Sequence, residues 1–522
     1  MSSARLDLRV AVDFGTTYTG VSFDTPNEEN NEIQIINKWP GEEGAEDKVP
    51  TVLAKDDDIN GDIKWGFSCK DLPDDKKWKL FKLLLDPAFL RRRLQNKGHD
   101  PWTPRKLSEV HDVVVRFLHQ VYLHISSAIP RLLQKAHSLR SGLKFKRWDS
   151  MNIEFIFSTP TTWSPPVSQC FRNLVARAGF GNEENHSIGL GLTEAEAAAV
   201  FICQPGNSNA KIRDKNVILS IDAGGGTTDL AFVRRMKGYF NLEEVRPVSG
   251  IGVGSTKIDW EFAELIKARM NENPVVKSTL PKNFALIASQ SPGFQTMKEN
   301  FGSKDWDQIS GEYFTQVAEA ERYTHADFKI KEGRLTFTRA ELKRCFDKTL
   351  ELIKTHLQDL LNEAQNHEGM KVDYIVISGG LGSSDYVLEQ LKEYIATKAK
   401  ERNSCVTGST ILTAKSHARK VVIHGLLSDR QSKHHALREY LARANYGIVP
   451  RRASPRGLLA GMSTSAEGNY AWPVKYRDTI KACKPVTIKI TRKLEPGQQR
   501  WTEEIVWLNG ERNDLPNRSS QG

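Results

Sequence analysis

The sequence has few cysteines and none of the cysteine spacings that bind metals or build disulfide frameworks. Its 522 residues include six cysteines, with no Cys-x-x-Cys pair, which argues against a zinc site and a disulfide-stapled scaffold. No apolar run approaches the ~18 to 20 residues that a membrane-spanning helix needs. The N-terminus also lacks the apolar core of a secretory signal. These absences predict a cytoplasmic protein, with the nucleus as the alternative, and no membrane span.

Acidic residues are fewer than basic ones, and the net charge is +10. Basic clusters occur at 91–93, 144–147 and 451–452. Such clusters can bind nucleic acid or an acidic membrane surface. Because no recognition motif frames them, we interpret them as solvated faces. We therefore do not expect nucleic-acid binding. Separately, we predict a monomer.

The common phosphate-binding motifs are also missing: neither a P-loop nor a Gly-x-Gly-x-x-Gly turn before a helix occurs. A different glycine-rich turn follows the apolar run 218–221. Its residues are Asp222, Gly224, Gly225, Gly226, Thr227, Thr228 and Asp229. Glycines let backbone N–H groups approach an anion, and flanking carboxylates can hold a hard cation beside it. The segment predicts a nucleotide-phosphate site built as a β-hairpin.

The same design occurs near the start of the chain, roughly 200 residues earlier, as Asp13-Phe14-Gly15-Thr16-Thr17-Tyr18. A third turn, Gly379-Gly380-Leu381-Gly382, lies between a predicted strand and a predicted helix. One such turn could be an ordinary tight hairpin. Two related copies followed by a strand–Gly-Gly–helix unit, in that order, indicate a nucleotide-binding protein.

Hydrophobic periodicity places these turns among alternating strands and helices. We predict strands within 8–23, 33–36, 153–158 and 373–378, and helices at 108–125, 168–179, 193–202, 257–270, 338–363, 384–399 and 421–427. Thr193 and Thr338 each begin a capping box. Beyond 428 the chain becomes basic and polar, with short strand-like pieces at 486–491 and 503–507. We therefore predict a domain boundary near 428.

The order and wording of the three turns resemble the actin, sugar-kinase and heat-shock ATPase superfamily, and most of all the heat shock protein 70 ATPase domain. The nearest branch is the divergent one typified by heat shock protein family A member twelve. The resemblance covers roughly residues 8–427 and implies an α/β, actin-like ATPase fold. Its two lobes, each a mixed β-sheet flanked by helices, would span about 1–205 and 206–400, with a return helix to 427. Residues 428–522 would form a short, reduced, β-rich C-terminal region.

The resemblance implies ATP or ADP with Mg²⁺ as cofactors. It assigns the water-mediated metal site to Asp13, Asp222 and Asp229. It assigns catalysis to Asp13, Lys82, Glu194, Asp222, Thr227 and Asp229. It assigns nucleotide binding to Gly15, Thr16, Thr17, Tyr18, Gly224, Gly225, Gly226, Thr227, Thr228, Gly254, Lys298, Gly379, Gly380 and Gly382. These residue types suit the chemistry, because Mg²⁺ keeps several waters and phosphoryl transfer depends on positioning and charge neutralisation.

Three assignments carry alternatives or departures. Lys82 competes with Lys79 for the family's catalytic lysine, and either could be an ordinary lysine on an amphipathic helix. In the adenine-binding helix only Lys298 matches, and Glu299 replaces a stacking arginine. Arg419 replaces an aspartate near the second connecting helix, in which Gly425 marks a close crossing. We therefore predict weaker or less base-selective nucleotide binding than in the standard chaperone.

These features predict a chaperone-like protein that binds Mg-ATP between its lobes, hydrolyses it slowly and couples nucleotide state to lobe closure. The implied partners are client proteins or co-chaperones, although the short tail makes ordinary peptide clamping doubtful. The alternative is a nucleotide-gated scaffold without significant hydrolysis. A small-molecule kinase of the same superfamily ranks lowest, because no motif supplies its additional aspartate base or substrate pocket.

Overall fold

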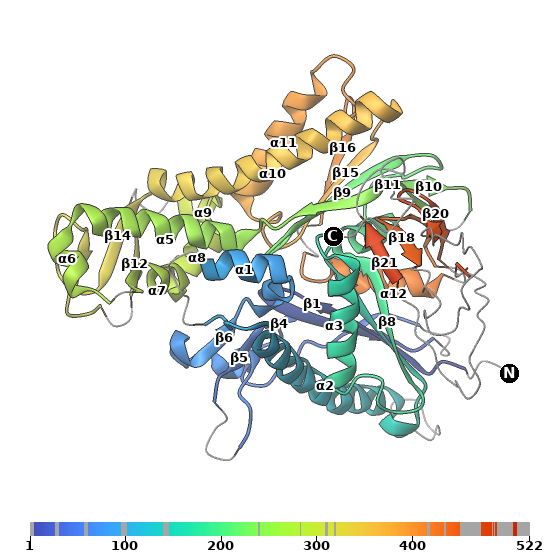
Figure 1. Cartoon of the computed structure of the whole chain (residues 1–522), viewed down its shortest axis with the longest axis horizontal. Coiled ribbons are helices and arrows are strands. Elements are labelled where there is room, and N and C mark those ends of the chain that lie inside the picture. Colours follow the sequence, from blue (N-terminus) through green and yellow to red (C-terminus); the bar gives the residue numbers. More distant parts are fainter. Residues whose placement is uncertain are drawn as a thin grey trace, which may run out of the picture.

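Two mixed β-sheets with the same internal strand order form the centre of the molecule (Figure 1). The computed structural model describes residues 5–26, 31–56, 61–95, 102–138, 146–238, 241–281, 283–307, 312–317, 320–414, 418–432, 435–448, 471–482, 484, 486–487 and 505–508. The first sheet has the order β3-β2-β1-β7-β8 and the second contains β11-β10-β9-β15-β16. In each, an antiparallel hairpin is flanked by another antiparallel strand on one side and two parallel strands on the other.

The strands of the two sheets occupy corresponding positions. Those of the first sheet are β1 (Leu8–Phe14), β2 (Tyr18–Asp24), β3 (Gln34–Ile35), β7 (Ile153–Thr159) and β8 (His186–Thr193), with β4 (Lys48–Pro50) paired to β2. Those of the second are β9 (Val217–Ala223), β10 (Thr228–Met236), β11 (Asn241–Ile251), β15 (Tyr374–Ser378) and β16 (Thr410–Thr413). Every residue of β9 is buried, as expected for a strand covered on both faces.

Helices cover both sheets and fill the space between them. The outer core of the first sheet includes α2 (Leu107–Ser138) and α3 (Pro165–Arg177). The core of the second includes α5 (Ser255–Glu272), α10 (Arg339–Glu368) and α11 (Asp385–Ala399). A third cluster joins both sheets through α4 (Glu194–Cys203) and α12 (Val421–Gln431). The predicted mixed α/β architecture is therefore confirmed, as are the capping boxes at Thr193 and Thr338.

Residues 271–333, which sequence periodicity did not resolve, form an extension beyond the second sheet (Figure 1). The extension contains α6 (Pro274–Thr279), α7 (Phe284–Gln290), α8 (Pro292–Asn300), α9 (Lys304–Asp307), β12 (Glu312–Gln316) and β13 (Ile330–Lys331), and β14 (Arg334–Thr338), which follows directly, completes its sheet. The strands pair in the order β12-β14-β13. Short elements explain the weak sequence signal, because none spans enough residues to show a clear period.

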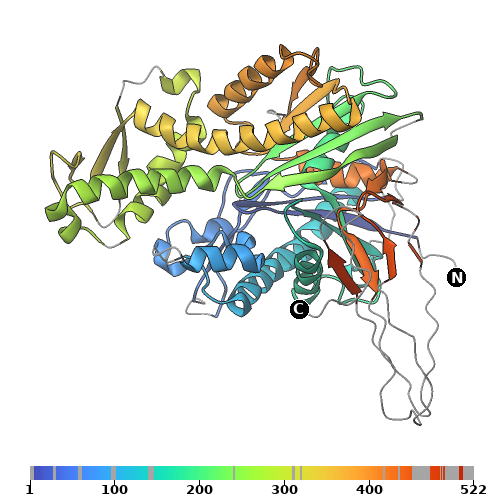
Figure 2. The ribbon, with the colours of Figure 1, turned by 45° about the horizontal axis from the view of Figure 1, so that its top comes forward.

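The chain past 428 contributes to the second sheet. Position 428 lies inside α12, which continues to Gln431. The strand β17 (Leu437–Leu441) pairs in parallel with β11, and β20 (Thr479–Lys481) pairs with β17. Three further strands, β18 (Asn445–Ile448), β19 (Ala471–Val474) and β21 (Ile505–Leu508), form a small antiparallel sheet beside it (Figure 2).

Some predictions fall partly outside the described residues. Of the strand-like piece 486–491, residues 486–487 are not in a strand and 488–491 are outside. The basic cluster at 451–452 and the first half of 144–147 are also outside. Within the described part of the chain, no helix is long and apolar enough to cross a membrane.

Candidate functional site

The two Asp–Gly–Thr turns meet face to face, although roughly 200 residues separate them in the sequence. A Cβ atom added to Gly225 would lie 2.7 Å from Oγ1 of Thr17. One added to Gly226 would lie 2.6 Å from Oγ1 of Thr16. Any larger residue at either position would push the turns apart. The structure therefore brings together the two segments that the sequence analysis singled out.

Each turn begins with a buried aspartate held by a serine from the neighbouring parallel strand. Ser158, near the end of β7, donates to Oδ1 of Asp13 at 2.9 Å. Ser378, at the end of β15, donates to Oδ1 of Asp222 at 2.6 Å. The equivalence follows from the matching strand order of the two sheets. The two serines thus fix the rotamers of two carboxylates that point toward the same place from opposite sheets.

The second hairpin adds another buried carboxylate. Asp229 pairs in register with Asp222 across β9 and β10. Its Oδ1 accepts the backbone N–H of Thr161 at 2.6 Å, and its Oδ2 accepts the hydroxyl of Thr227 at 2.7 Å. These bonds anchor one carboxylate that faces the turns. Thr227 is predicted to bind phosphate, but in this structure its hydroxyl donates to Asp229.

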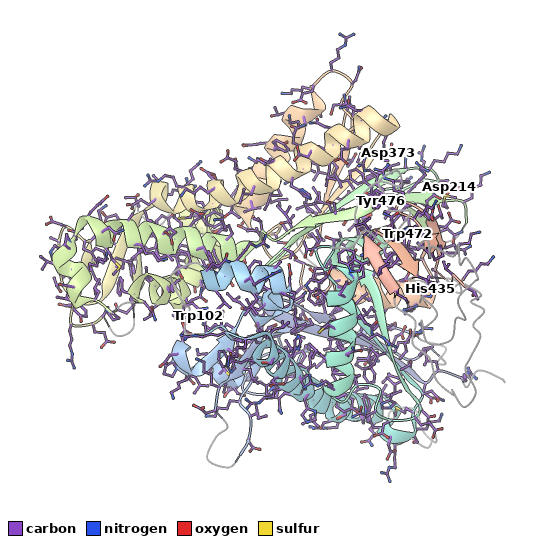
Figure 3. All side chains as sticks on the ribbon, in the orientation of Figure 1. Trp102, Asp214, Asp373, His435, Trp472 and Tyr476 are labelled. Carbon is purple, nitrogen blue, oxygen red and sulfur yellow. The ribbon has the colours of Figure 1, made fainter. Side chains whose placement is uncertain are left out.

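Two ammonium groups, one buried and one partly buried, balance these acids. Nζ of Lys82 lies 2.8 Å from Oε1 of Glu194, and both residues are under 10% exposed. Lys82 belongs to the 3₁₀ turn Phe81–Leu85 rather than to an amphipathic helix. Its competitor Lys79 instead pairs with Asp74 at 2.6 Å. Nζ of Lys79 also lies 5.7 Å from the centre of the ring of Trp102, which is labelled in Figure 3.

The second ammonium group belongs to Lys48, which the sequence analysis did not select. Its Nζ lies 2.6 Å from Oδ2 of Asp13. Strand pairing explains the contact, because Lys48 lies opposite Gly20 and Gly20 lies opposite Asp13. A Cβ on Gly20 would lie 3.1 Å from Cγ of Lys48, so the missing side chain lets the lysine cross β2.

The carboxylates differ in acidity because their surroundings differ. The pKa of Glu194 is raised to about 8, mainly by burial, with Lys82 opposing and the three aspartates adding to the rise. Burial also raises the pKa of Asp222 to about 6, with Ser378 opposing. Burial would raise the pKa of Asp13 as well, but Lys48 and Lys82 outweigh it and the pKa is lowered. Burial raises the pKa of Asp229 as well. The site therefore has one acid stabilised as the anion and three that ionise reluctantly.

This donor set fits a hydrated divalent cation. The three aspartates raise the pKa of Glu194, and Asp13 and Asp229 raise that of Asp222; a cation among these acids would relieve their repulsion. The described residues include no group of three or more His, Cys, Asp or Glu that could hold a metal directly. Carboxylates that face a metal through water suit Mg²⁺, which dehydrates reluctantly.

The third glycine turn divides into structural and open positions. Gly379 has a φ of 83°, and a Cβ there would lie 2.2 Å from the carbonyl oxygen of Ala223. A Cβ on Gly382 would lie 2.2 Å from the carbonyl oxygen of Ser378. Gly380 has no atom within 4 Å of its Cβ position. Gly379 is therefore needed to pack the turn onto β9 and Gly382 to close the turn on the end of β15, whereas Gly380 has room for a ligand.

Two other predicted residues shape the second turn from behind. The backbone N–H of Thr256, next to the start of α5, donates to the carbonyl oxygen of Gly225 at 2.9 Å. A Cβ on Gly254 would lie 2.6 Å from that same oxygen. The hydroxyl of Thr228 donates to the carbonyl oxygen of Val253 at 2.8 Å. Gly254 thus lets the two backbone segments lie close together, and the Thr228 hydroxyl bonds to a backbone carbonyl, so both residues hold the turn in place.

The predicted adenine side consists of ion pairs within the protein. Nζ of Lys298 lies 2.6 Å from Oδ1 of Asp259, and both side chains are buried. Arg419 forms an ion pair with Glu46, and its guanidinium lies 5.8 Å from the ring of Tyr18. Tyr18 therefore faces a cation where the family pattern has an acid. Burial and then Glu299 raise the pKa of Tyr18, so Glu299 lies near enough to affect the same ring.

Four residues of the site were missed by sequence reasoning: Lys48, Ser158, Thr161 and Ser378. The serines had a usable signal, because each lies at the end of a predicted strand immediately before or near a turn. Thr161 follows a Thr-Pro break and carried no specific pattern. Lys48 had none at all, because its position depends on the pairing of β4 with β2.

Known proteins match the chain only distantly. A family model described as a domain of unknown function (DUF8340) matches residues 211–402. Heat shock 70 kDa protein 12A of Homo sapiens is 20% identical over 445 residues, which cover 72% of this chain and 64% of the human protein. The Mus musculus protein of the same name is 21% identical over 474 residues, covering 77% of this chain and 68% of its own length. The predicted relation to this divergent heat shock 70 branch is confirmed, and the chain spans about two thirds of these relatives.

Proposed function

We propose that the chain is a heat shock 70-like protein with an actin-like ATPase fold, which binds Mg-ATP between two lobes and hydrolyses it slowly. The lobes correspond to about residues 1–205 and 206–400, with α12 as the return helix. The observation that carries the proposal is the apposition of the two Asp–Gly–Thr turns, at Gly225–Thr17 and Gly226–Thr16. Opposed turns of this kind hold a phosphate chain from both sides with backbone N–H groups.

The residues divide the work of phosphoryl transfer between positioning and charge. Thr16 and Thr17, with the glycines opposite them, bind the phosphates. Asp13, Asp222 and Asp229 would hold hydrated Mg²⁺, which neutralises phosphate charge when it is bound. Lys82 would neutralise the terminal phosphate, and Glu194, held by Lys82 at Oε1, is the group that would hydrogen-bond and orient the attacking water. Client proteins or co-chaperones are the proposed partners.

The test of this function is a pair of lysine substitutions. Lys82→Met is expected to slow single-turnover ATP hydrolysis by ~100-fold or more, the loss typical of removing one charge-stabilising group. Binding of Mg-ATP, measured by calorimetry, is expected to change far less. Lys79→Met, which removes a lysine paired with Asp74, is the matched control and should keep the wild-type rate. Equal rates for all three proteins would contradict the assignment of Lys82.

Base selectivity is expected to be low. The one lysine retained from the adenine pattern, Lys298, is bound to Asp259 at 2.6 Å, and Glu299 provides no cation to stack on a base. Each missing cation–π contact removes ~0.5 to 2 kcal/mol. We therefore expect ATP and GTP to bind within ~10-fold of each other in calorimetric titrations, a difference of ~1.4 kcal/mol at most. Tight binding of ATP with strong discrimination against GTP would contradict this prediction.

A second function, nucleotide binding without significant hydrolysis, is favoured by one observation. Lys48 occupies Oδ2 of Asp13 at 2.6 Å, an oxygen that the first proposal needs for a metal-bound water. If Lys48 stays there when nucleotide binds, the metal shell is incomplete and turnover stops at binding. Wild-type protein that binds Mg-ATP stoichiometrically but gives no single-turnover product would identify this case.

A further inference from the structure

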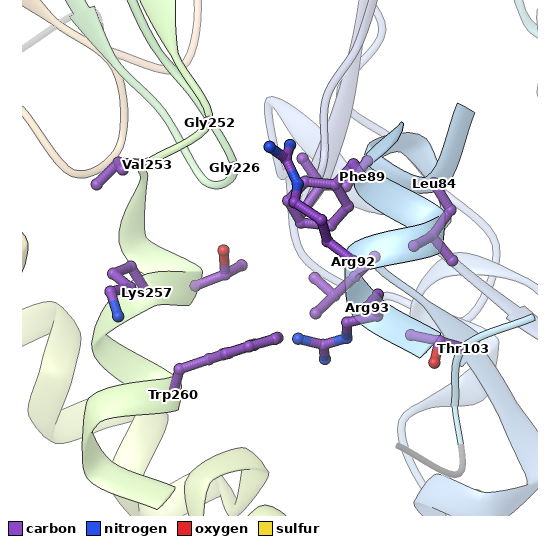
Figure 4. A pocket seen from close by; sticks show the side chains of 13 residues that line it. Leu84, Phe89, Arg92, Arg93, Thr103, Gly226, Gly252, Val253, Lys257 and Trp260 are labelled. Carbon is purple, nitrogen blue, oxygen red and sulfur yellow. The ribbon is translucent and has the colours of Figure 1, made fainter. Parts of the chain in front are cut away.

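A cavity of about 240 Å³ lies directly behind the second glycine turn and is separate from the carboxylate site. One wall is formed by the 3₁₀ turn Phe81–Leu85 and α1 (Pro87–Gln95), the other by α5 and the residues before it. Figure 4 shows Arg93 extending from α1 toward Trp260 of α5 on the opposite wall, whereas Arg92 extends past Phe89 toward the turn at Gly226. The cavity therefore lies between elements that pack against different sheets.

The lining combines an apolar interior with cationic groups. Its thirteen described residues include Leu83, Phe89 and Trp260, together with three cationic side chains and no carboxylate. The guanidinium carbon of Arg93 lies 3.5 Å from the centre of the Trp260 ring, a stacked contact that orients the guanidinium plane. Lys257 forms an ion pair with Glu261 at 2.5 Å.

Gly226 is the partition between this cavity and the proposed phosphate site. A Cβ on Gly226 would lie 2.5 Å from Cδ2 of Leu83, on the cavity side, and 2.6 Å from Oγ1 of Thr16, on the turn side. A molecule in the cavity would thus contact Gly226 from the side facing away from Thr16, without entering the space between the two turns. Burial lowers the pKa of Arg93 to about 9, and an anion in the cavity would favour its charged form.

We propose that this cavity binds a small organic acid with an apolar body, as a second ligand beside the nucleotide site. The apolar walls would cover the body, and the guanidinium group of Arg92 or of Arg93 would bind the carboxylate, for which the planar arginine fork is suited. A volume of about 240 Å³ is below the ~300 to 1,000 Å³ common for drug-sized ligands, so the ligand is smaller than a nucleotide. Bound there, it would bridge α1 and α5. This ligand site depends on the cavity alone and is additional to the proposed ATP site.

The experiment uses the full chain without nucleotide and two matched probes, 4-phenylbutyrate and the neutral 4-phenylbutyramide. Calorimetric or ligand-observed NMR titration is expected to show saturable binding of the carboxylate, at least ~10-fold tighter than the amide, as charge-assisted hydrogen bonds predict. The double variant Arg92→Gln/Arg93→Gln should lose this preference. Arg91→Gln, an exposed arginine of the same helix outside the cavity, is the control and should bind like the wild type.

Two results would overturn the inference: no saturable binding of 4-phenylbutyrate, or equal binding by the wild type and the double variant when circular dichroism shows both folded. ATP is titrated separately, so failure of nucleotide binding would contradict the proposed function and leave the cavity result standing. A further titration with the phosphate analogue inorganic pyrophosphate locates the probe. Displacement of 4-phenylbutyrate by pyrophosphate would place it in the phosphate turns and overturn the separate site, whereas simultaneous binding supports it.

Discussion

Gly425→Ala is expected to lower the free energy of unfolding by about 3 kcal/mol or more, the upper range for overpacking a buried contact. A Cβ at this position would lie 2.0 Å from the carbonyl oxygen of Ala197 and 2.6 Å from its carbonyl carbon. Both are backbone atoms of α4, whose residues are all buried. Since α4 and α12 share one core cluster with both sheets, neither helix can move aside without disturbing that core.

The sign of the effect makes this substitution informative. In an exposed helix, Gly→Ala usually stabilises by ~1 kcal/mol, so a large loss can arise only from the close crossing. Urea unfolding followed by circular dichroism measures it. Gly44→Ala is the control, because the nearest atom to its Cβ position is the end of Glu42 at 3.6 Å, and it should stay within ~0.5 kcal/mol of the wild type. Equal stability of the two variants would show that α4 and α12 do not cross this closely.

Asp222→Asn is expected to increase the stability of the ligand-free protein by about 3 kcal/mol at pH 8, and to have little effect near pH 3. The pKa of Asp222 is about 6 in the folded protein, against an ordinary value of 3.8. The folded state therefore binds this proton more tightly, and its stability falls as the pH rises from about 4 through about 6. Two pKa units correspond to about 3 kcal/mol. Asparagine removes this penalty, and its carbonyl oxygen can still accept the Ser378 hydroxyl.

Asp13→Asn is the matched comparison and is expected to act in the opposite direction. The pKa of Asp13 is lowered below 3.8 by Lys48 and Lys82 in spite of burial. Its stabilising contribution is present above the unfolded pKa and is lost as the pH falls through the folded one. At pH 8 the substitution therefore destabilises, since it leaves the partly buried Lys48 without its carboxylate partner. Urea titrations of both variants at pH 4 and pH 8 decide the matter: equal pH responses would contradict the difference between the two turns.

Local pattern was sufficient for most elements and for the identity of the turns. Thr193 and Thr338 allowed the starts of their helices to be predicted, because a capping box involves only four consecutive residues. The strands before Asp13 and Asp222 were visible as apolar runs because both faces of each sheet are covered. The segment 271–333 was not resolved because its helices and strands are too short to establish a period. The end of α12 was missed because polar residues continue a helix whose first half alone is apolar.

The sequence by itself determined what each turn is made of: an acid, glycines and hydroxyls at the end of a buried strand, which are local properties of a few consecutive residues. Only the tertiary structure decided what the turns do together. The meeting of Gly226 with Thr16 depends on how two sheets pack, and the ion pair of Lys48 with Asp13 depends on strand register across β2. Both are set by long-range pairing, for which a single sequence carries no periodic signal. The same packing decided which of the repeated glycines keep two backbones in contact and which, like Gly380, leave room for a ligand.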